Sequence, residues 1–364
     1  MYLAWKEIRY AKLRYSLIIG IMLLVAYVVF MLSGLANGLS DGHKKAVSDW
    51  GASSIILSED SNKVVSASIL TQGDLDRVTA KEKAAVGLTA SAISHENNSK
   101  KTNISVFGAQ ANSFVVPDVI DGRLYQAADE VIVSENVLTD GFKLGDKITL
   151  GSDDTIFTIV GVTKATTYSV VPVLYLDLDA FAQLKYGNQT YTEDSQKPIT
   201  LIATKSTASN ITLENEDETT MLTALTMDDF IQNLPGYSAE KLTLNAMVYF
   251  LFIVVAAVVG IFLYVMTLQK TALFGILKAQ GVATGYLIRS IVGQSLIVSV
   301  VGVGLAFLLS YATSLVLPTA MPFTVDLPQW AMYGVLLIFV SMIGGLFSIR
   351  TVTNVDPITA IGGE

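Results

Sequence analysis

The chain has 364 residues, of which 51% are hydrophobic and only 15% are charged, whereas soluble globular proteins carry about 25% charged residues. The charge is uneven, because residues 37–241 carry a net charge of −12 and the two flanking segments together carry +4. The lack of a basic, aromatic-interleaved patch argues against nucleic acid as a partner. The absence of cysteine excludes disulfides, thiolate metal sites and cysteine nucleophiles.

The first 15 residues have the pattern of an amphipathic helix. At 100° per residue the apolar side chains share one face and the basic side chains lie largely opposite. We expect this helix to lie on the cytoplasmic leaflet with Trp5 at headgroup depth; the alternative is a plain positively charged anchor. The apolar face consists of Met1, Ala4, Trp5, Ile8, Ala11 and Tyr15, and the basic face of Lys6, Arg9 and Lys12.

Four stretches are long and apolar enough to span a bilayer, which takes about 20 residues. None of them contains Asp, Glu, Lys, Arg or His. The first ends without a clear signal-peptidase site, so we predict a retained helix. The fourth opens with Trp330, a residue type typical of the membrane interface. The apolar stretches are 17–35, 244–268, 291 to between 309 and 317, and 330–349.

Basic residues in the short flanking segments predict the orientation, because cytoplasmic loops are enriched in Lys and Arg. Four precede the first span, and three lie between the second and third spans without any acidic residue. We therefore predict a multi-pass plasma membrane protein with both termini cytoplasmic and a large domain outside. The predicted layout is a surface helix (1–15), a span (16–36), an exterior block (37–241), a span (242–268), a cytoplasmic loop (269–289), a span (290–317), an external loop (318–329), a span (330–349) and a cytoplasmic tail (350–364).

The exterior block is predicted to be an α+β domain inserted between the first and second of four membrane-spanning α-helices. Runs rich in β-branched residues predict strands, and two such runs around Gly151 predict a hairpin within 143–162. We expect two subdomains, the smaller at about 118–195. The predicted strands are 53–57, 104–108, 130–134, 156–162, 171–176 and 199–204, and the predicted helices are 71–79, 177–186 and 227–234.

The motifs of common catalytic sites are missing. The sequence has no P-loop for ATP phosphates, and neither H-E-x-x-H nor G-x-S-x-G is present. The two histidines, His43 and His95, are expected at the surface, and no ionisable residue lies in mid-membrane to support an ion relay. We therefore predict that the chain is not an enzyme, has no intrinsic cofactor and takes energy for any work across the membrane from a partner.

The cytoplasmic loop is the expected contact with that partner. In QKTALFGILKAQG (269–281) the side chains of Leu273, Phe274 and Leu277 form a short apolar ridge flanked by Lys270 and Lys278. A helix with such a ridge suits a hydrophobic groove on another protein. The alternative is a helix that simply lies on the membrane surface.

These features together resemble ABC transporter permeases of the macrolide-exporter type (MacB-like, or type VII). The resemblance covers the whole chain and is carried by the layout, the loop LFGILKAQG, the hairpin GFKLGDKITLGSDDTIFTIVGV and the tail VDPITAI at 355–361. It implies a homodimer that works with a separate pair of ATPase subunits, in which nucleotide-driven closure inside moves the helices and the exterior domain. It also implies coupling contacts at Leu273, Phe274, Leu277 and Lys278.

Within that superfamily the chain is similar to the haem-exporter permeases (HrtB-like), which are relatives of the heterocyst glycolipid-exporter permeases (DevC-like). The compact length, the opening YLAWKEIRYAKLRYSLIIG and the segment PGYSAE at 235–240 carry this similarity. It implies haem as an amphipathic substrate that is taken from the membrane or its outer face.

Four residues are predicted to bind such a substrate. Haem iron accepts His, Cys, Met or Tyr; Tyr237 and Glu240 share one face of a helical turn, and Met31 lies near the outer end of the first span. Tyr168 is expected to be a second exposed tyrosine, whereas His43 is a weak candidate. The alternative is that Tyr237 belongs to an interfacial aromatic belt, Glu240 caps a helix and Met31 packs in a core.

Two other functions stay open. An exporter of lipophilic antibiotics or antimicrobial peptides would share the architecture. A regulator similar to the cell-division permeases (FtsX-like) would instead activate a cell-wall hydrolase through its exterior domain.

If the loop at 269–281 is a coupling contact, Phe274→Asp is expected to uncouple ATPase assembly while leaving membrane insertion intact.

Overall fold

A computed structural model describes Glu7 and residues 9–96, 100–151, 155–187, 191, 193–215, 220–318 and 321–346. The chain divides into two compact units. The helical unit comprises Met1–Gly38 and Lys241–Glu364, and the sheet unit comprises Leu39–Glu240, close to the predicted exterior block 37–241. Residues 1–6 and 8 of the predicted surface helix, which include Trp5, and the predicted tail 350–364 lie outside the described residues.

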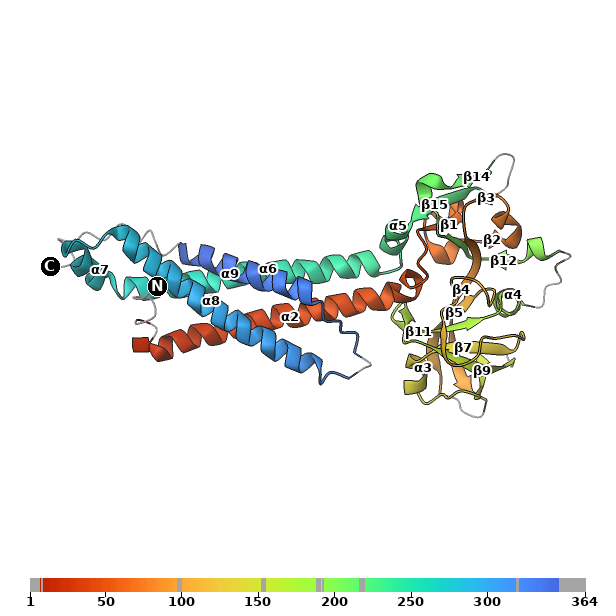
Figure 1. Ribbon diagram of the computed structural model, residues 1–364, viewed down its shortest axis with the longest axis horizontal. Helices are drawn as coiled ribbons and strands as arrows, with labels where there is room; N and C mark the ends of the chain where they lie inside the picture. Colours follow the sequence, from red (N-terminus) through yellow and green to blue (C-terminus); the bar gives the residue numbers. More distant parts are fainter. Residues whose placement is uncertain are drawn as a thin grey trace. The chain divides into compact units, whose positions relative to one another are not determined.

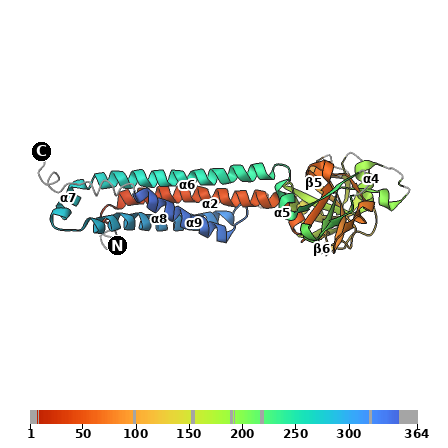
Figure 2. The same ribbon diagram turned by 90° about the horizontal axis from the view of Figure 1, so that it is seen from above.

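The helical unit is built from helices that are long and apolar enough to cross a membrane. Four such helices occur in the described part of the chain, and Figures 1 and 2 show them side by side. A shorter helix joins the second to the third at one end (Figure 1). Their bounds are α2 (Lys12–Ser48), α6 (Tyr237–Leu268), the short α7 (Thr271–Ala279), α8 (Thr284–Ser314) and α9 (Leu327–Leu346).

Aromatic side chains fill one end of the helical core. Trp330 on α9 is fully buried, with its ring centroid 5.4 Å from that of Phe30 on α2 and 5.8 Å from that of Phe307 on α8. The expectation of an interfacial Trp330 is therefore wrong. The ring lies on the face of α9 that packs against α2 and α8, because burying a large aromatic surface there stabilises the packing of three helices.

Glycines allow two pairs of these helices to approach closely. A Cβ atom on Gly344 of α9 would lie 2.5 Å from the carbonyl oxygen of Ala256 on α6, and one on Gly302 of α8 would lie 2.6 Å from Cβ of Met22 on α2. No side chain fits at either point, so the helix backbones are in direct contact. Small residues are the usual means of close helix packing in membranes.

A buried polar network ties the N-terminal segment to the helices beside α7. The carboxylate of Glu7 accepts hydrogen bonds from Nζ of Lys270 at 2.8 Å and from Nε2 of Gln294. Oε1 of Gln294 in turn accepts a hydrogen bond from the Tyr15 hydroxyl at 2.6 Å. Lys270 directly precedes α7, so the network fixes the start of that helix.

The sheet unit contains a sheet of eleven strands, six of which close into a ring. Around the ring, β4 pairs with β5, β5 with β11, β11 with β7, β7 with β9, β9 with β8, and β8 with β4. The first residues of β4 also pair with β13, which continues to β1 and β15. The ring begins at β4, upstream of the predicted smaller subdomain 118–195.

The strands of this sheet are β1 (Ser54–Ser58), β4 (Lys83–His95), β5 (Thr102–Gly108), β6 (Val119–Gly122), β7 (Glu130–Ser134), β8 (Lys147–Leu150), β9 (Ile156–Thr163), β10 (Thr167–Tyr168), β11 (Val171–Leu176), β13 (Leu201–Thr204) and β15 (Leu222–Thr226). Short pairs are formed by β2 (Leu70–Thr71) with β12 (Pro198–Ile199) and by β3 (Val78–Thr79) with β14 (Thr212–Leu213). The unit also contains the short helices α3 (Asn136–Thr139), α4 (Leu178–Tyr186) and α5 (Met227–Gln232).

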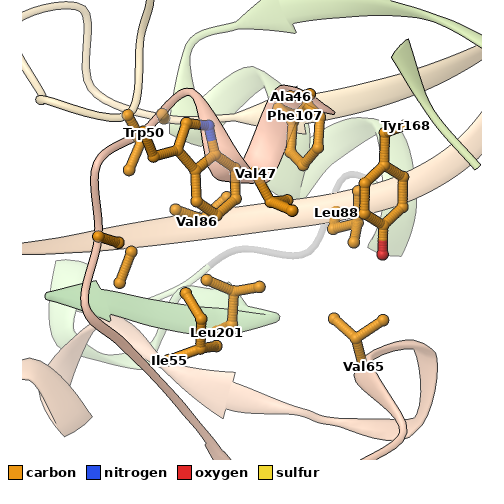
Figure 3. Close-up of a cluster of buried hydrophobic side chains, with 14 of the residues drawn as sticks. Ala46, Val47, Trp50, Ile55, Val65, Val86, Leu88, Phe107, Tyr168 and Leu201 are labelled. Atoms are coloured by element: carbon orange, nitrogen blue, oxygen red, sulfur yellow. The ribbon is translucent and has the colours of Figure 1, made fainter. Parts of the chain in front are cut away.

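Both faces of the ring strands are covered, which explains their unbroken apolar runs. Alternate residues such as Val131 and Val133 belong to one buried cluster, while Ile132 between them belongs to another. The second cluster also contains Val47, from the end of α2, and Trp50, from the turn that follows α2 (Figure 3). The last turns of α2 are therefore part of the core of the sheet unit.

The strand predictions agree with the structure, and one helix prediction is wrong. Each of the six predicted strands overlaps an observed strand, and the predicted hairpin is the antiparallel pair β8–β9. In place of the predicted helix 71–79, residues Gln72–Leu75 form a single 3₁₀ turn between β2 and β3. Asp74 caps this turn by accepting a hydrogen bond from the Thr71 N–H at 2.7 Å, so the acidic residues mark a turn rather than a helix.

The contact at Gly344 yields a stability prediction. Gly344→Leu would force α9 away from α6, and overpacking of this kind costs about 1–3 kcal/mol. We expect a lower melting temperature of the detergent-purified protein. Gly304→Leu on the exposed side of α8, where a Cβ atom meets nothing within 4 Å, is the matched control. Equal melting temperatures for the two variants would contradict this helix contact.

The polar network of Glu7, Tyr15, Lys270 and Gln294 yields a second stability prediction. Gln294→Leu would leave the buried Tyr15 hydroxyl without its acceptor, at a cost of about 1–3 kcal/mol, so we expect a lower melting temperature. Gln280→Leu, at the exposed end of α7, replaces the same residue type outside the network and should change little. If the melting temperature of Gln294→Leu equals that of the wild type, the network does not stabilise this end of the helical unit.

Candidate functional site

Four polar side chains meet where α2 ends and α6 begins. Ser40 and His43 lie three residues apart on α2, and Tyr237 and Glu240 lie three residues apart in the first turn of α6, so each pair shares a helix face. Nε2 of His43 is 3.1 Å from Oε2 of Glu240, and Oγ of Ser40 donates a hydrogen bond to the Tyr237 hydroxyl at 3.1 Å. We call these four residues the α2–α6 cluster.

The cluster is largely shielded from solvent. His43 is 9% exposed and Tyr237 is 2% exposed, and their rings meet edge to face with centroids 6.2 Å apart. The Glu240 side chain keeps 33% of its surface exposed, and its position in the first turn of α6 suits the positive end of the helix dipole. The cluster is thus a half-closed site with a carboxylate at its open side.

A strained turn covers the same part of α2. The turn between β10 and β11 donates hydrogen bonds from the N–H of Ser169 to the carbonyl of His43 at 3.2 Å and from the N–H of Val170 to that of Gly42 at 2.9 Å. Ser169 and Val170 have φ values of 51° and 65°. Positive φ is a true outlier for a β-branched residue and costs of order 1–3 kcal/mol. The two residues are the centre of the two-residue hairpin between β10 and β11, a turn that takes positive φ at both positions.

The structure places two of the predicted substrate ligands in the α2–α6 cluster and buries a third in the core of the sheet unit. Tyr237 and Glu240 meet in the α2–α6 cluster, as their spacing predicted. Tyr168 is 5% exposed in the core of the sheet unit (Figure 3), where its ring lies 5.4 Å from that of Phe107, and burial raises the pKa of its hydroxyl. The prediction of an exposed Tyr168 is therefore wrong. Met31 belongs to the helical unit and is partly buried, and its role stays a prediction.

The sequence pattern does not identify Ser40 as a member of the cluster. His43 is only a weak candidate by sequence, and the prediction of a surface position for His43 is wrong, because the residue is 9% exposed. The predicted span ended at residue 36, whereas α2 continues to Ser48. Continuing the helical period past the span would have placed Ser40, His43 and the buried Val47 on one face, with the two polar residues beside the apolar one.

The short helix α7 presents a different ridge from the predicted one. Phe274 is 3% exposed and packs against Leu287 and Ile291 of α8. It therefore anchors α7, and the ridge prediction is wrong for this residue. Leu273 remains exposed at 47%, and so does Ile276 at 44%, whereas the predicted contacts Leu277 and Lys278 are partly buried.

The sheet unit also contains a cavity outside the α2–α6 cluster. The cavity has a volume of about 760 Å³ and is lined by residues that include Lys45, Trp50 and the buried Tyr175, with no histidine or methionine among them. Within the described ranges, no three His, Cys, Asp or Glu side chains are grouped to hold a metal ion. Of these two places, the α2–α6 cluster is the one that contains a histidine.

Two family models match the chain. The model described as the MacB-like periplasmic core domain matches residues 16–222, and the model described as the FtsX-like permease C-terminal matches residues 245–357. The first match covers more than half of the chain. Its start in α2 and its end in β15 include most of the sheet unit.

Relatives align over the full length. A protein of Staphylococcus epidermidis (strain ATCC 12228 / FDA PCI 1200), named "putative hemin transport system permease protein HrtB", is 30% identical over 367 residues, covering 100% of this chain and 99% of the relative. An uncharacterized ABC transporter permease of Mycobacterium tuberculosis (strain ATCC 25618 / H37Rv) is 25% identical, with 100% and 99% covered. The solved extracellular domain of the noncanonic ABC-type transporter YknZ is 16% identical, covers 43% of this chain and 85% of that domain, and has a TM-score of 0.30.

These matches confirm the resemblance drawn from the layout, the loop and the tail. The chain belongs to the family of ABC transporter permeases that join a MacB-like periplasmic core domain to an FtsX-like permease C-terminal domain.

Proposed function

We propose that the chain is the membrane subunit of an ABC-type efflux system that exports an amphipathic substrate, with haem as the best single candidate. The observation that carries this proposal is the full-length 30% identity to a protein named as a hemin transport permease. A cluster of phenol, imidazole and carboxylate groups supports it, because these are groups that bind haem iron or orient its ligands.

The energy for export would come from a separate ATPase on the cytoplasmic side. The spanning stretches carry no ionisable residue and the chain has no P-loop, so neither an ion gradient nor bound ATP has groups to act on. The basic residues beside the first span and in the 269–289 loop support an orientation with α7 and both termini in the cytoplasm and the sheet unit outside. The sheet unit would then be an extracytoplasmic α+β domain inserted after the first span.

The substrate would bind at the start of α6 and the end of α2. Haem has an apolar ring that prefers lipid and two propionates that prefer water. Tyr237 and Glu240, with Met31 as a further contact, are the residues that we propose for it. Two copies of the chain would act as a homodimer, and ATP-driven closure would move the helices and so displace the bound substrate.

The exposed side chains of α7 give a test of the coupling contact. Leu273→Glu or Ile276→Glu puts a charge on the exposed ridge without disturbing the buried Phe274, and a charge cannot enter an apolar groove. We expect at least a tenfold loss of the ATPase subunit that co-purifies with the chain. Ile69→Glu, which replaces another exposed apolar residue in the sheet unit, is the control.

Retention of the ATPase by both α7 variants would contradict this contact. Phe274→Asp is a poor test, because it would also unfold α7 by burying an unpaired charge.

The substrate is tested by titrating haem into the purified full-length protein and following the Soret band. Replacing Glu240 or Met31 by Ala, or Tyr237 by Phe, should weaken haem binding about tenfold or more, the range found when a metal ligand loses its support. Tyr168→Phe changes a tyrosine in the core and should leave binding unchanged. If the wild-type protein does not bind haem, another amphipathic substrate must be sought.

A further inference from the structure

The two ring nitrogens of His43 have different surroundings. Nε2 lies 3.1 Å from the carboxylate of Glu240, which can only accept, so this nitrogen carries the proton. A neutral imidazole protonated at Nε2 has a lone pair at Nδ1. In the part of the chain that the structure describes, Nδ1 is buried and has no hydrogen-bond partner.

A buried acceptor without a partner is unusual, because nearly all buried polar atoms are hydrogen-bonded. The residue is 9% exposed, so water does not readily replace the missing partner. A carboxylate on one imidazole nitrogen with a free lone pair on the other is the arrangement of a metal-ligating histidine, in which the carboxylate fixes the tautomer and raises the basicity of the ligand.

The neighbours of His43 are committed to other contacts. The hydroxyl of Tyr237 accepts a hydrogen bond from Ser40, and the carboxylate of Glu240 binds His43. These two residues orient the cluster, whereas Nδ1 of His43 keeps an unused lone pair. Histidine is also a common protein ligand of haem iron.

We propose that Nδ1 of His43 is the iron ligand of the exported haem and that Glu240 is the positioning residue that holds the imidazole. The proposal rests on the proposed function and assigns the iron contact to a residue outside the set Met31, Tyr237 and Glu240. An iron contact at His43 narrows the class of possible substrates to amphipathic molecules that carry a metal able to bind imidazole.

Iron can reach Nδ1 only if the cover over this part of α2 opens. The turn at Ser169 and Val170 is bonded to the carbonyls of Gly42 and His43 in the strained geometry described above. Opening requires these two hydrogen bonds to break, whereas the positive φ values belong to the two-residue hairpin between β10 and β11 and stay with it. The turn therefore acts as the cover of the ligand position.

The sequence offers an internal control, because it contains only two histidines. His95 stacks on Phe142, and its Nδ1 lies 3.7 Å from Asp146 in the sheet unit. The full-length protein is purified with an affinity tag that lacks histidine and is loaded with haem. Electron paramagnetic resonance and the Soret band then report whether an imidazole is bound to the iron.

We expect an imidazole-ligated spectrum for the wild type and for His95→Ala, and loss of that spectrum with at least a tenfold weaker haem affinity for His43→Ala. Added free imidazole should restore the spectrum in His43→Ala. His43→Gln keeps an N–H donor for Glu240 but no comparable lone pair, and it should behave like His43→Ala while eluting and melting as the wild type does. Iron-free protoporphyrin should bind the wild type and His43→Ala equally.

The outcomes separate this inference from the proposed function. If His43→Ala and His43→Gln bind haem with the wild-type spectrum and affinity, His43 is not the ligand and haem export still stands. If His95→Ala alone loses the imidazole spectrum, the assignment is overturned in favour of the other histidine. If the wild type binds neither haem nor protoporphyrin, both the inference and the choice of substrate fall.

Discussion

One unbroken helix is the element on which the rest of the structure depends. A bilayer requires about 20 helical residues, whereas α2 has 37 and is about 55 Å long at 1.5 Å per residue. Its earlier residues, such as Phe30, are buried in the core of the helical unit, and its last turns give Val47 to the core of the sheet unit. The same helix therefore supplies side chains to both units.

The candidate site follows from where two such helices change units. Ser40 and His43 lie in the part of α2 that follows the helical unit in sequence. Tyr237 and Glu240 lie in the part of α6 that precedes the return of the chain to the helical unit. The cluster therefore joins the end of α2 to the start of α6 within the sheet unit.

Sequence patterns predicted the elements better than their contacts. Apolar length identified the spans, and β-branched runs identified strands such as β7 and β9, because both signals are local. The 13-residue strand β4 was missed, since its small residues (KAAVGLTASAISH) lack a strong β signal and its pairings are long-range. The burial of Trp330 and Phe274 could not be predicted, because an aromatic side chain at a helix end suits an interface and a core equally until the packing partner is known. His43 was misjudged for a related reason, since its partner Glu240 lies 197 residues away.

In the proposed function, binding of substrate outside the membrane and hydrolysis of ATP inside it are coupled through this chain. The most direct measurement is the rate of ATP hydrolysis by the complex of chain and ATPase, reconstituted in vesicles with haem supplied only on the side of the sheet unit. We expect haem on that side to speed hydrolysis and to leave the membrane only while ATP is hydrolysed. A rate of ATP hydrolysis that haem does not change, or haem that leaves the membrane equally fast without the ATPase, would contradict this coupling.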